Sequence, residues 1–96
     1  MFHHVVLFKL KDNSEKNIQK VRTILLSMEG NISVLEHLEV GVNVLSSDRS
    51  YDIFIKASFL NEEDYHIYQE DPYHVDRVLY FLKPLLEDSK TCDYLT

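Results

Sequence analysis

Hydrophobic and polar positions alternate in three segments of the chain, and each segment predicts a β-strand. The first covers residues 2–10 (FHHVVLFKL) and is largely apolar on both faces, so we expect both faces to be covered. In the second, residues 38–44, only one face is apolar. The third, residues 51–59, follows the polar turn 46–50 and predicts a hairpin with the second.

The segment between the first two strands has the pattern of an amphipathic helix. Ser14, with Asn17 three residues later, can cap its start, and Gly30 can supply the left-handed residue that ends it. The apolar stripe at helical spacing consists of Ile18, Val21, Leu25 and Met28. We therefore expect one helix here that packs against the sheet.

A second helical region is predicted after the third strand, in two pieces. Asn61, with Asp64 three residues later, favours the start of a short helix that runs to about Glu70. Asp71 then suits the N-cap of a new helix, and Pro72 suits its first position.

The last quarter of the chain continues this second piece. Its apolar stripe consists of Val75, Val78, Leu79, Leu82, Leu85 and Leu86. Pro84 is expected to end or kink the helix, and residues 91–95 to form a short final strand.

The resulting order, β-α-β-β-α-β, is that of a ferredoxin-like α+β domain. Right-handed crossover connections place both helices on one face of a four-stranded antiparallel sheet. The other face then stays open although several of its side chains are apolar, which is typical of an association surface. We expect a homodimer in which two sheets close face to face into a dimeric α/β barrel.

Length, charge and cysteine content narrow the function classes. The 96 residues fit a single domain over residues 1–96. The 16 acidic residues outnumber the 10 Lys and Arg, the net charge is −6 and no basic cluster occurs, so we expect no binding to nucleic acid or to an anionic membrane. The lone Cys92 excludes an internal disulfide. Without a visible signal peptide or membrane span, the expected location is cytoplasmic.

Three short motifs occur in order along the chain. They are His4-Val5-Val6-Leu7-Phe8-Lys9, then Tyr51-Asp52 at the start of the third strand, then Tyr68-x-x-x-Pro72-x-His74. Together, and over nearly the whole chain, they resemble the Dabb family of stress-responsive α/β-barrel domains. The resemblance implies a dimeric α+β barrel, related to the antibiotic-monooxygenase-like dimers.

The resemblance also bears on activity. Most bacterial members have no established activity, whereas a plant branch acts as polyketide cyclases in which a His and a Tyr perform acid–base chemistry. Carried over by position, the His is His74 and the Tyr is Tyr68, with His4 nearby on the first strand. The family commonly has a second His before the Pro, where this chain has Asp71. A mechanism that needs both histidines is therefore not implied here.

Each candidate residue also has a purely structural interpretation. His74 lies in the first turn of a helix, whose dipole favours the neutral imidazole that a general base requires, but it can equally be a packed histidine. Tyr68 can be the edge of the core, and Asp71 is explained as an N-cap. His3 and His4 point to opposite faces of one strand, so at most one of them faces a pocket, and His4 matches the family position.

Two functions from different classes remain open. The first is a small-molecule-binding domain, with a stress-linked role, that holds an apolar or aromatic ligand inside the barrel. The second is a cofactor-independent enzyme of polyketide-cyclase or antibiotic-monooxygenase-like type that uses His74 with Tyr68. In both, the apolar wall is predicted to consist of Val6, Ile53, Val78 and Phe81. No third ligand accompanies His66 and Glu70, and no nucleotide or flavin motif occurs, so we expect neither a metal nor a cofactor.

Overall fold

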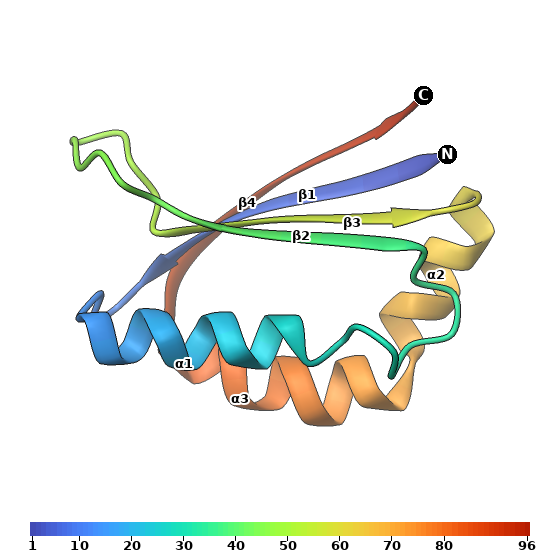
Figure 1. Cartoon of the computed structure of the whole chain (residues 1–96), viewed down its shortest axis with the longest axis horizontal. Helices are drawn as coiled ribbons and strands as arrows, with labels where there is room; N and C mark the ends of the chain where they lie inside the picture. The colour runs from blue at the N-terminus through green and yellow to red at the C-terminus, as the bar shows by residue number, and fades with distance from the viewer.

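A computed structural model describes residues 1–96, and its element order is the one predicted. A β-strand begins the chain, two helical regions follow at the predicted places, and a long strand ends it (Figure 1). The elements are β1 Phe2–Leu10, α1 Glu15–Leu26, β2 His37–Val42, β3 Ile53–Phe59, α2 Glu62–Glu70, the π-helix η1 Tyr73–Leu79, α3 Tyr80–Leu82, the 3₁₀-helix η2 Lys83–Leu85 and β4 Leu86–Leu95. None of the helices has both the length and the hydropathy of a membrane-spanning segment.

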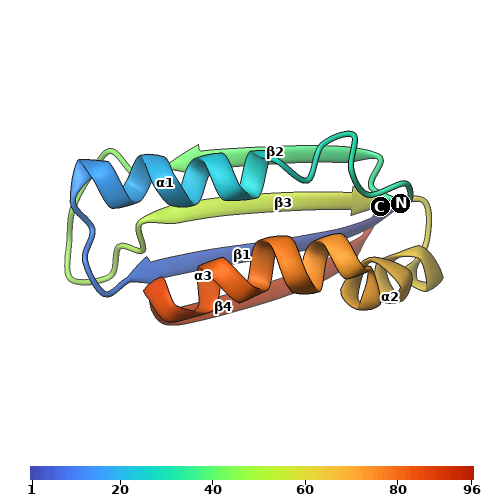
Figure 2. The ribbon, with the colours of Figure 1, turned by 90° about the horizontal axis from the view of Figure 1, so that it is seen from below.

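The four strands form one antiparallel sheet in the order β2-β3-β1-β4, which confirms the ferredoxin-like fold. All helices lie on one face of the sheet, with α1 on the β2 side and α3 on the β1–β4 side (Figures 1 and 2). No helix covers the opposite face. Alternate residues of each strand therefore meet different surroundings: one set faces the helices and the other faces outward.

The core fills the space between the sheet and the helices. Val6 on β1 pairs with Ile55 on β3, and both are buried beneath the helices. Val21 and Leu25 on α1 are fully buried against them, as the helical spacing predicts. Only two buried residues are polar, Ser58 and His74. Each has a hydrogen-bond partner, as buried polar side chains do: Ser58, on the outward side of β3, bonds to His3, and His74, on the helix side, bonds to the Gln69 carbonyl.

The predicted caps are present in the structure. Ser14 Oγ accepts a hydrogen bond from the Asn17 backbone N–H, and Asn61 Oδ1 accepts one from that of Asp64. Gly30 adopts the left-handed conformation with φ of 79°, although α1 itself ends earlier and a turn connects the two.

The strand boundaries differ from the prediction in the second half of the chain. β2 ends at Val42 and β3 begins at Ile53, so the connecting loop is longer than expected. β4 covers Leu86–Leu95 rather than only residues 91–95, and it pairs with β1 along its whole length. Its charged and polar residues suit an exposed edge strand, where they oppose pairing with other chains. Leu86 therefore belongs to the sheet and not to the helical stripe.

Candidate functional site

A cavity of about 370 Å³ lies between the helix-facing side of the sheet and the second helical region. Its volume is within the usual range of small-molecule pockets, about 300–1,000 Å³. It is lined by residues from β1, β3, β4, α1, α2, η1 and α3: His4, Val6, Phe8, Leu25, Met28, Ile55, Tyr65, Tyr68, Gln69, His74, Val78, Leu79, Leu82, Ser89, Thr91 and Asp93. It is formed by residues of one chain and is partly open to solvent, on the opposite side of the sheet from the open face.

Five of the seven residues proposed from the sequence line this cavity. They are His4, Val6, Tyr68, His74 and Val78. His4 and Val6 arrive from alternate positions of β1, Tyr68 from the last turn of α2, and the other two from η1. The aromatic rings form a continuous group: the ring centroids of Tyr68 and His74 are 4.1 Å apart, and those of Tyr68 and His4 are 6.3 Å apart.

The other two proposed residues lie elsewhere. Ile53 is buried in the same core but does not line the cavity, and Phe81 is 50% exposed on the outer surface beside Tyr80. The helix geometry explains why Phe81 faces away from the cavity. In the π-helix η1 each turn takes more residues than in an α-helix, so the buried positions are His74, Val78 and Leu82, four residues apart.

His4 is joined to the edge strand by a short hydrogen bond. Its Nδ1 is 2.5 Å from Oδ1 of Asp93, the residue directly opposite it on β4. A carboxylate can only accept, so Nδ1–H donates and the Nε2 of a neutral His4 keeps its lone pair. His4 is therefore oriented by a carboxylate, and the second nitrogen of the ring is available to accept a proton or a hydrogen bond.

His74 lines the same cavity from η1. Pro72 begins its helix, and the Asp71 carboxylate accepts a hydrogen bond from the Tyr73 backbone N–H at 2.8 Å, as an N-cap does. The side chain of His74 is 8% exposed, and its Nδ1 donates to the carbonyl oxygen of Gln69 at 3.3 Å. Burial lowers its pKa, and the nearby His4 lowers it further, so the imidazole is neutral at pH 7.

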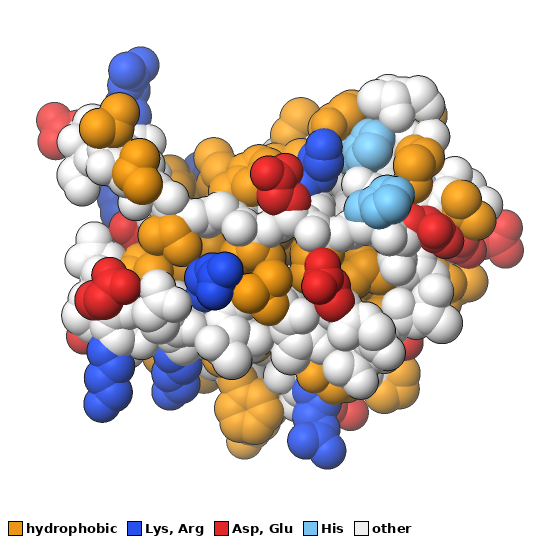
Figure 3. Space-filling model, viewed as in Figure 1, with side chains coloured by type: hydrophobic (Ala, Val, Ile, Leu, Met, Phe, Trp, Pro, Cys, Tyr) orange, Lys and Arg blue, Asp and Glu red, His pale blue; other side chains and the backbone are white.

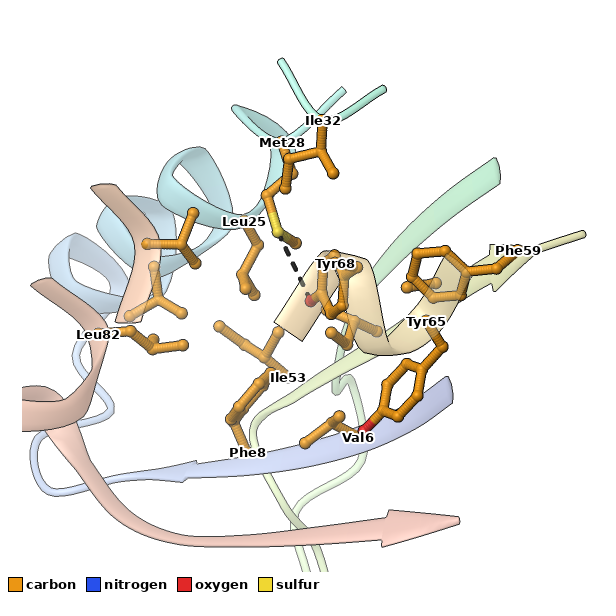
Figure 4. Close-up of a cluster of buried hydrophobic side chains, with 14 of the residues drawn as sticks. Val6, Phe8, Leu25, Met28, Ile32, Ile53, Phe59, Tyr65, Tyr68 and Leu82 are labelled. Atoms are coloured by element: carbon orange, nitrogen blue, oxygen red, sulfur yellow. Dashed lines mark hydrogen bonds between the residues drawn. The ribbon is translucent and has the colours of Figure 1, made fainter. Parts of the chain in front are cut away.

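Tyr68 is almost completely buried, which restricts its use as an acid–base group. Its hydroxyl points to the turn that follows α1 and donates to the sulfur of Met28, with an O–S distance of 3.7 Å (Figure 4). Burial raises the pKa of Tyr68 far above its usual value, and Tyr65 adds to this increase. The phenol thus keeps its proton and can act as a hydrogen-bond donor, but not as a base.

Several lining residues were not found from the sequence. Tyr65 accepts a hydrogen bond from Gln69 Nε2 at 2.6 Å, and its ring lies 4.9 Å from that of His4. Ser89, Thr91 and Asp93 form a polar row along the helix-facing side of β4. No local pattern indicates this row, because it becomes visible only once the register between β1 and β4 is known.

The cavity combines mostly apolar side chains with several polar groups, which is the usual composition of a small-molecule site. Two imidazoles, each with Nδ1 engaged, and one tyrosine hydroxyl are the groups capable of proton transfer or hydrogen bonding to a ligand. The structure brings no three His, Cys, Asp or Glu side chains together in a way that would hold a metal ion.

Several solved structures share this fold. A dimeric ferredoxin-like protein of unknown function from Thermobifida fusca is 23% identical (TM-score 0.85, covering 99% of this chain and 90% of that one). A dimeric protein of unknown function from Bacteroides fragilis is 26% identical (TM-score 0.81, covering 99% and 95%). A hydroxynitrile lyase from Passiflora edulis is 16% identical (TM-score 0.78, covering 99% and 92%). No curated protein sequence matches significantly.

The family assignment rests on nearly the whole chain. The model of the stress responsive A/B barrel domain, Dabb, matches residues 2–96. The match includes β1 with His4, the helix that carries Tyr68 and the π-helix that carries His74. The chain therefore belongs to the Dabb family of stress responsive A/B barrel domains.

Proposed function

We propose that this Dabb domain binds a small apolar or aromatic molecule that carries a hydroxyl or carbonyl group. The observation that carries the proposal is the convergence of His4, Tyr68 and His74 on one cavity lined mostly by apolar side chains. The ligand body would pack against Val6 and Val78, and its polar group would reach the imidazoles.

The direction of the hydrogen bonds favours a ligand with a donor. Because Nδ1 of His4 donates to Asp93 and Nδ1 of His74 donates to Gln69, each neutral ring offers Nε2 as an acceptor. A phenol or an enol donates one hydrogen bond and has an apolar remainder, so it satisfies an acceptor without leaving other polar groups unpaired.

One observation favours the enzyme alternative. His4 with Asp93 has the arrangement of a carboxylate-oriented general base, and the neutral His74 lies in the same cavity. A cofactor-independent reaction would then consist of proton abstraction by an imidazole, with the Tyr68 hydroxyl as a donor. Tyr68 would serve as the acid only if the ligand displaced its contact with Met28.

We further propose that the domain works as a homodimer through its open sheet face. In support, Val5, Leu7 and Phe54 lie on that face without cover from their own chain, and Leu7 is 38% exposed. The two similar proteins from T. fusca and B. fragilis are described as dimeric. Light scattering at micromolar concentration should give about twice the 11.4 kDa chain mass; a purely monomeric species would contradict this part of the proposal.

Calorimetry with 4-alkylphenols of increasing chain length tests the binding function. Wild-type protein should bind them, and His74→Ala should weaken binding modestly if the domain only binds. If the domain is an enzyme, His74→Ala should lower turnover of a reactive phenolic or polyketide-like substrate by ~10²–10⁴ with the fold intact. His66→Ala, an exposed histidine on α2 away from the cavity, is the matched control. No binding of any such compound would contradict the proposal.

A further inference from the structure

The loop between β2 and β3, residues 43–52, rises from the sheet on the side away from the helices (Figure 1). Close to its β2 end it carries two aliphatic residues in succession. Val44 is 89% exposed and Leu45 is 79% exposed, the highest exposures among the large hydrophobic residues. They therefore make almost no contact with their own chain, and the fold does not need them for its core.

The loop is nevertheless well ordered by its own hydrogen bonds. The carbonyl oxygen of Leu45 accepts from Asn43 Nδ2 at 2.9 Å and from Ser50 Oγ at 2.8 Å. Ser50 is also bonded to Ser47, Oγ to Oγ, at 2.9 Å. At the base of the loop, the Asn43 backbone N–H donates to the carbonyl oxygen of Asp52 at 3.0 Å. The two aliphatic side chains are thus presented on a preorganised support, which reduces the entropy lost on docking.

The sheet face on the same side of the molecule is hollow and partly apolar. Leu7, Phe54 and Gly41 lie in one row across β1, β3 and β2 on the outward side of the sheet. With Tyr51 and others they line a depression of about 390 Å³. The space-filling view shows the upper surface dipping between the loop and the end of the sheet that holds the termini (Figure 3).

We propose that residues 43–52 form a docking arm whose Val44 and Leu45 pack against the open sheet face of a second copy of this chain. This inference rests on the homodimer proposed above and specifies what completes its interface. In a face-to-face pair each loop rises toward the partner, so two arms flank the contact between the sheets. The partner is a second copy because the arm and the apolar depression lie on the same side of one molecule and similar proteins are dimeric.

Analytical ultracentrifugation of matched variants tests the arm. Val44→Ser combined with Leu45→Ser removes two exposed apolar side chains from each arm, so the fold should be unchanged and the dimer Kd should rise on the order of 100-fold. The control is Tyr80→Ser combined with Phe81→Ser, which removes 71% and 50% exposed apolar side chains on the helical side. The control should dimerise like the wild type.

The outcomes separate the two proposals. A loop variant with the fold and the Kd of the wild type would overturn the arm while leaving the dimer in place. An equal loss of dimer in the loop variant and the control would also overturn it, because the effect would not be specific to the loop. A wild-type chain that stays monomeric at every concentration would overturn the homodimer, and the arm with it.

Discussion

The imidazole of His4 on β1 and the carboxylate of Asp93 on the edge strand β4 are directly opposite each other, with Nδ1 and Oδ1 2.5 Å apart. The contact fixes the ring of His4 at the cavity and selects its tautomer. It also ties the edge strand to the site, although no residue of β4 is buried. A carboxylate that orients an imidazole is an arrangement that both binding and proton transfer can use.

This contact predicts the tautomer of His4. In wild-type protein at pH 8, ¹⁵N NMR should show neutral His4 protonated at Nδ1, because the Asp93 carboxylate accepts from that atom. Asp93→Ala should abolish the preference, whereas Asp76→Ala, on an exposed helical position, should not. Protonation at Nε2 in the wild type would show that the carboxylate does not orient this ring.

His74 should make stability depend on pH. Its folded-state pKa is lowered by burial below the unfolded value of 6.5, so below that pH the unfolded state binds more protons. Stability is therefore unaffected by this group above about pH 7 and is lost as the pH falls through 6.5. Besides burial, the hydrogen bond to the Gln69 carbonyl and the Asp71 carboxylate raise the pKa of His74, whereas His4 and Lys83 lower it.

Urea unfolding at pH 8, 7, 6 and 5 measures this dependence. Wild type should lose more stability than His74→Gln between pH 7 and pH 5, since the variant lacks the titrating group. His3→Gln is the control variant. His3 is the other histidine whose pKa is lowered, and it lies on the open sheet face, away from the cavity. Parallel curves for wild type and His74→Gln would mean that His74 is solvated in the folded protein.

The hydroxyl of Tyr68 should matter little to stability. Tyr68→Phe removes one hydrogen bond to a weak sulfur acceptor on Met28, so it should cost less than about 1 kcal/mol. Tyr68→Ala also removes a fully buried ring and should cost about 3–5 kcal/mol. If Tyr68→Phe nevertheless weakens phenol binding strongly, the hydroxyl turns toward the ligand. A large stability loss in Tyr68→Phe would contradict the weak-bond interpretation.

Asp71 is predicted to act on the helix rather than on the ligand. Its side chain accepts from the Tyr73 N–H and its carbonyl from the Val75 N–H, so Asp71→Ala should cost about 0.5–2 kcal/mol. Asp71→Asn keeps an equivalent cap and should cost much less. Equilibrium unfolding distinguishes the two variants. Unchanged stability in Asp71→Ala together with lost ligand binding would assign the residue to the site.

The fold was predictable where side-chain periodicity and burial agree. Residues 2–10 were predicted as a strand with both faces largely apolar and covered; β1 has those bounds, and within the chain the helices cover one of its faces. The start of β4 was missed because Glu87, Asp88 and Ser89 have low strand propensity. Pairing with β1 overrides that propensity, as it commonly does for edge strands. Leu86 also fits the apolar stripe of the preceding helix, so the hydrophobic pattern alone does not show that the helical region ends at Leu85 and that β4 begins at Leu86.

The candidate site was predictable only in part, because some of its residues depend on strand register and helix winding, which the sequence pattern does not show. His4, Tyr68 and His74 meet because the order of elements brings β1 and the second helical region together. Asp93 depends on the register of two strands, and a slip of one residue would turn it to the other face. Phe81 was misplaced because the spacing argument assumed an α-helix, whereas Tyr73–Leu79 is wound as a π-helix.

Locating a bound phenol tests the central claim most directly. In ¹H–¹⁵N and methyl NMR titrations with a 4-alkylphenol, the largest shifts should occur at His4, Val6 and His74, with Val44 on the loop as the internal control. His74→Ala should reduce them. Shifts confined to the open sheet face, or no saturable shifts at all, would contradict a ligand site between the sheet and the helices.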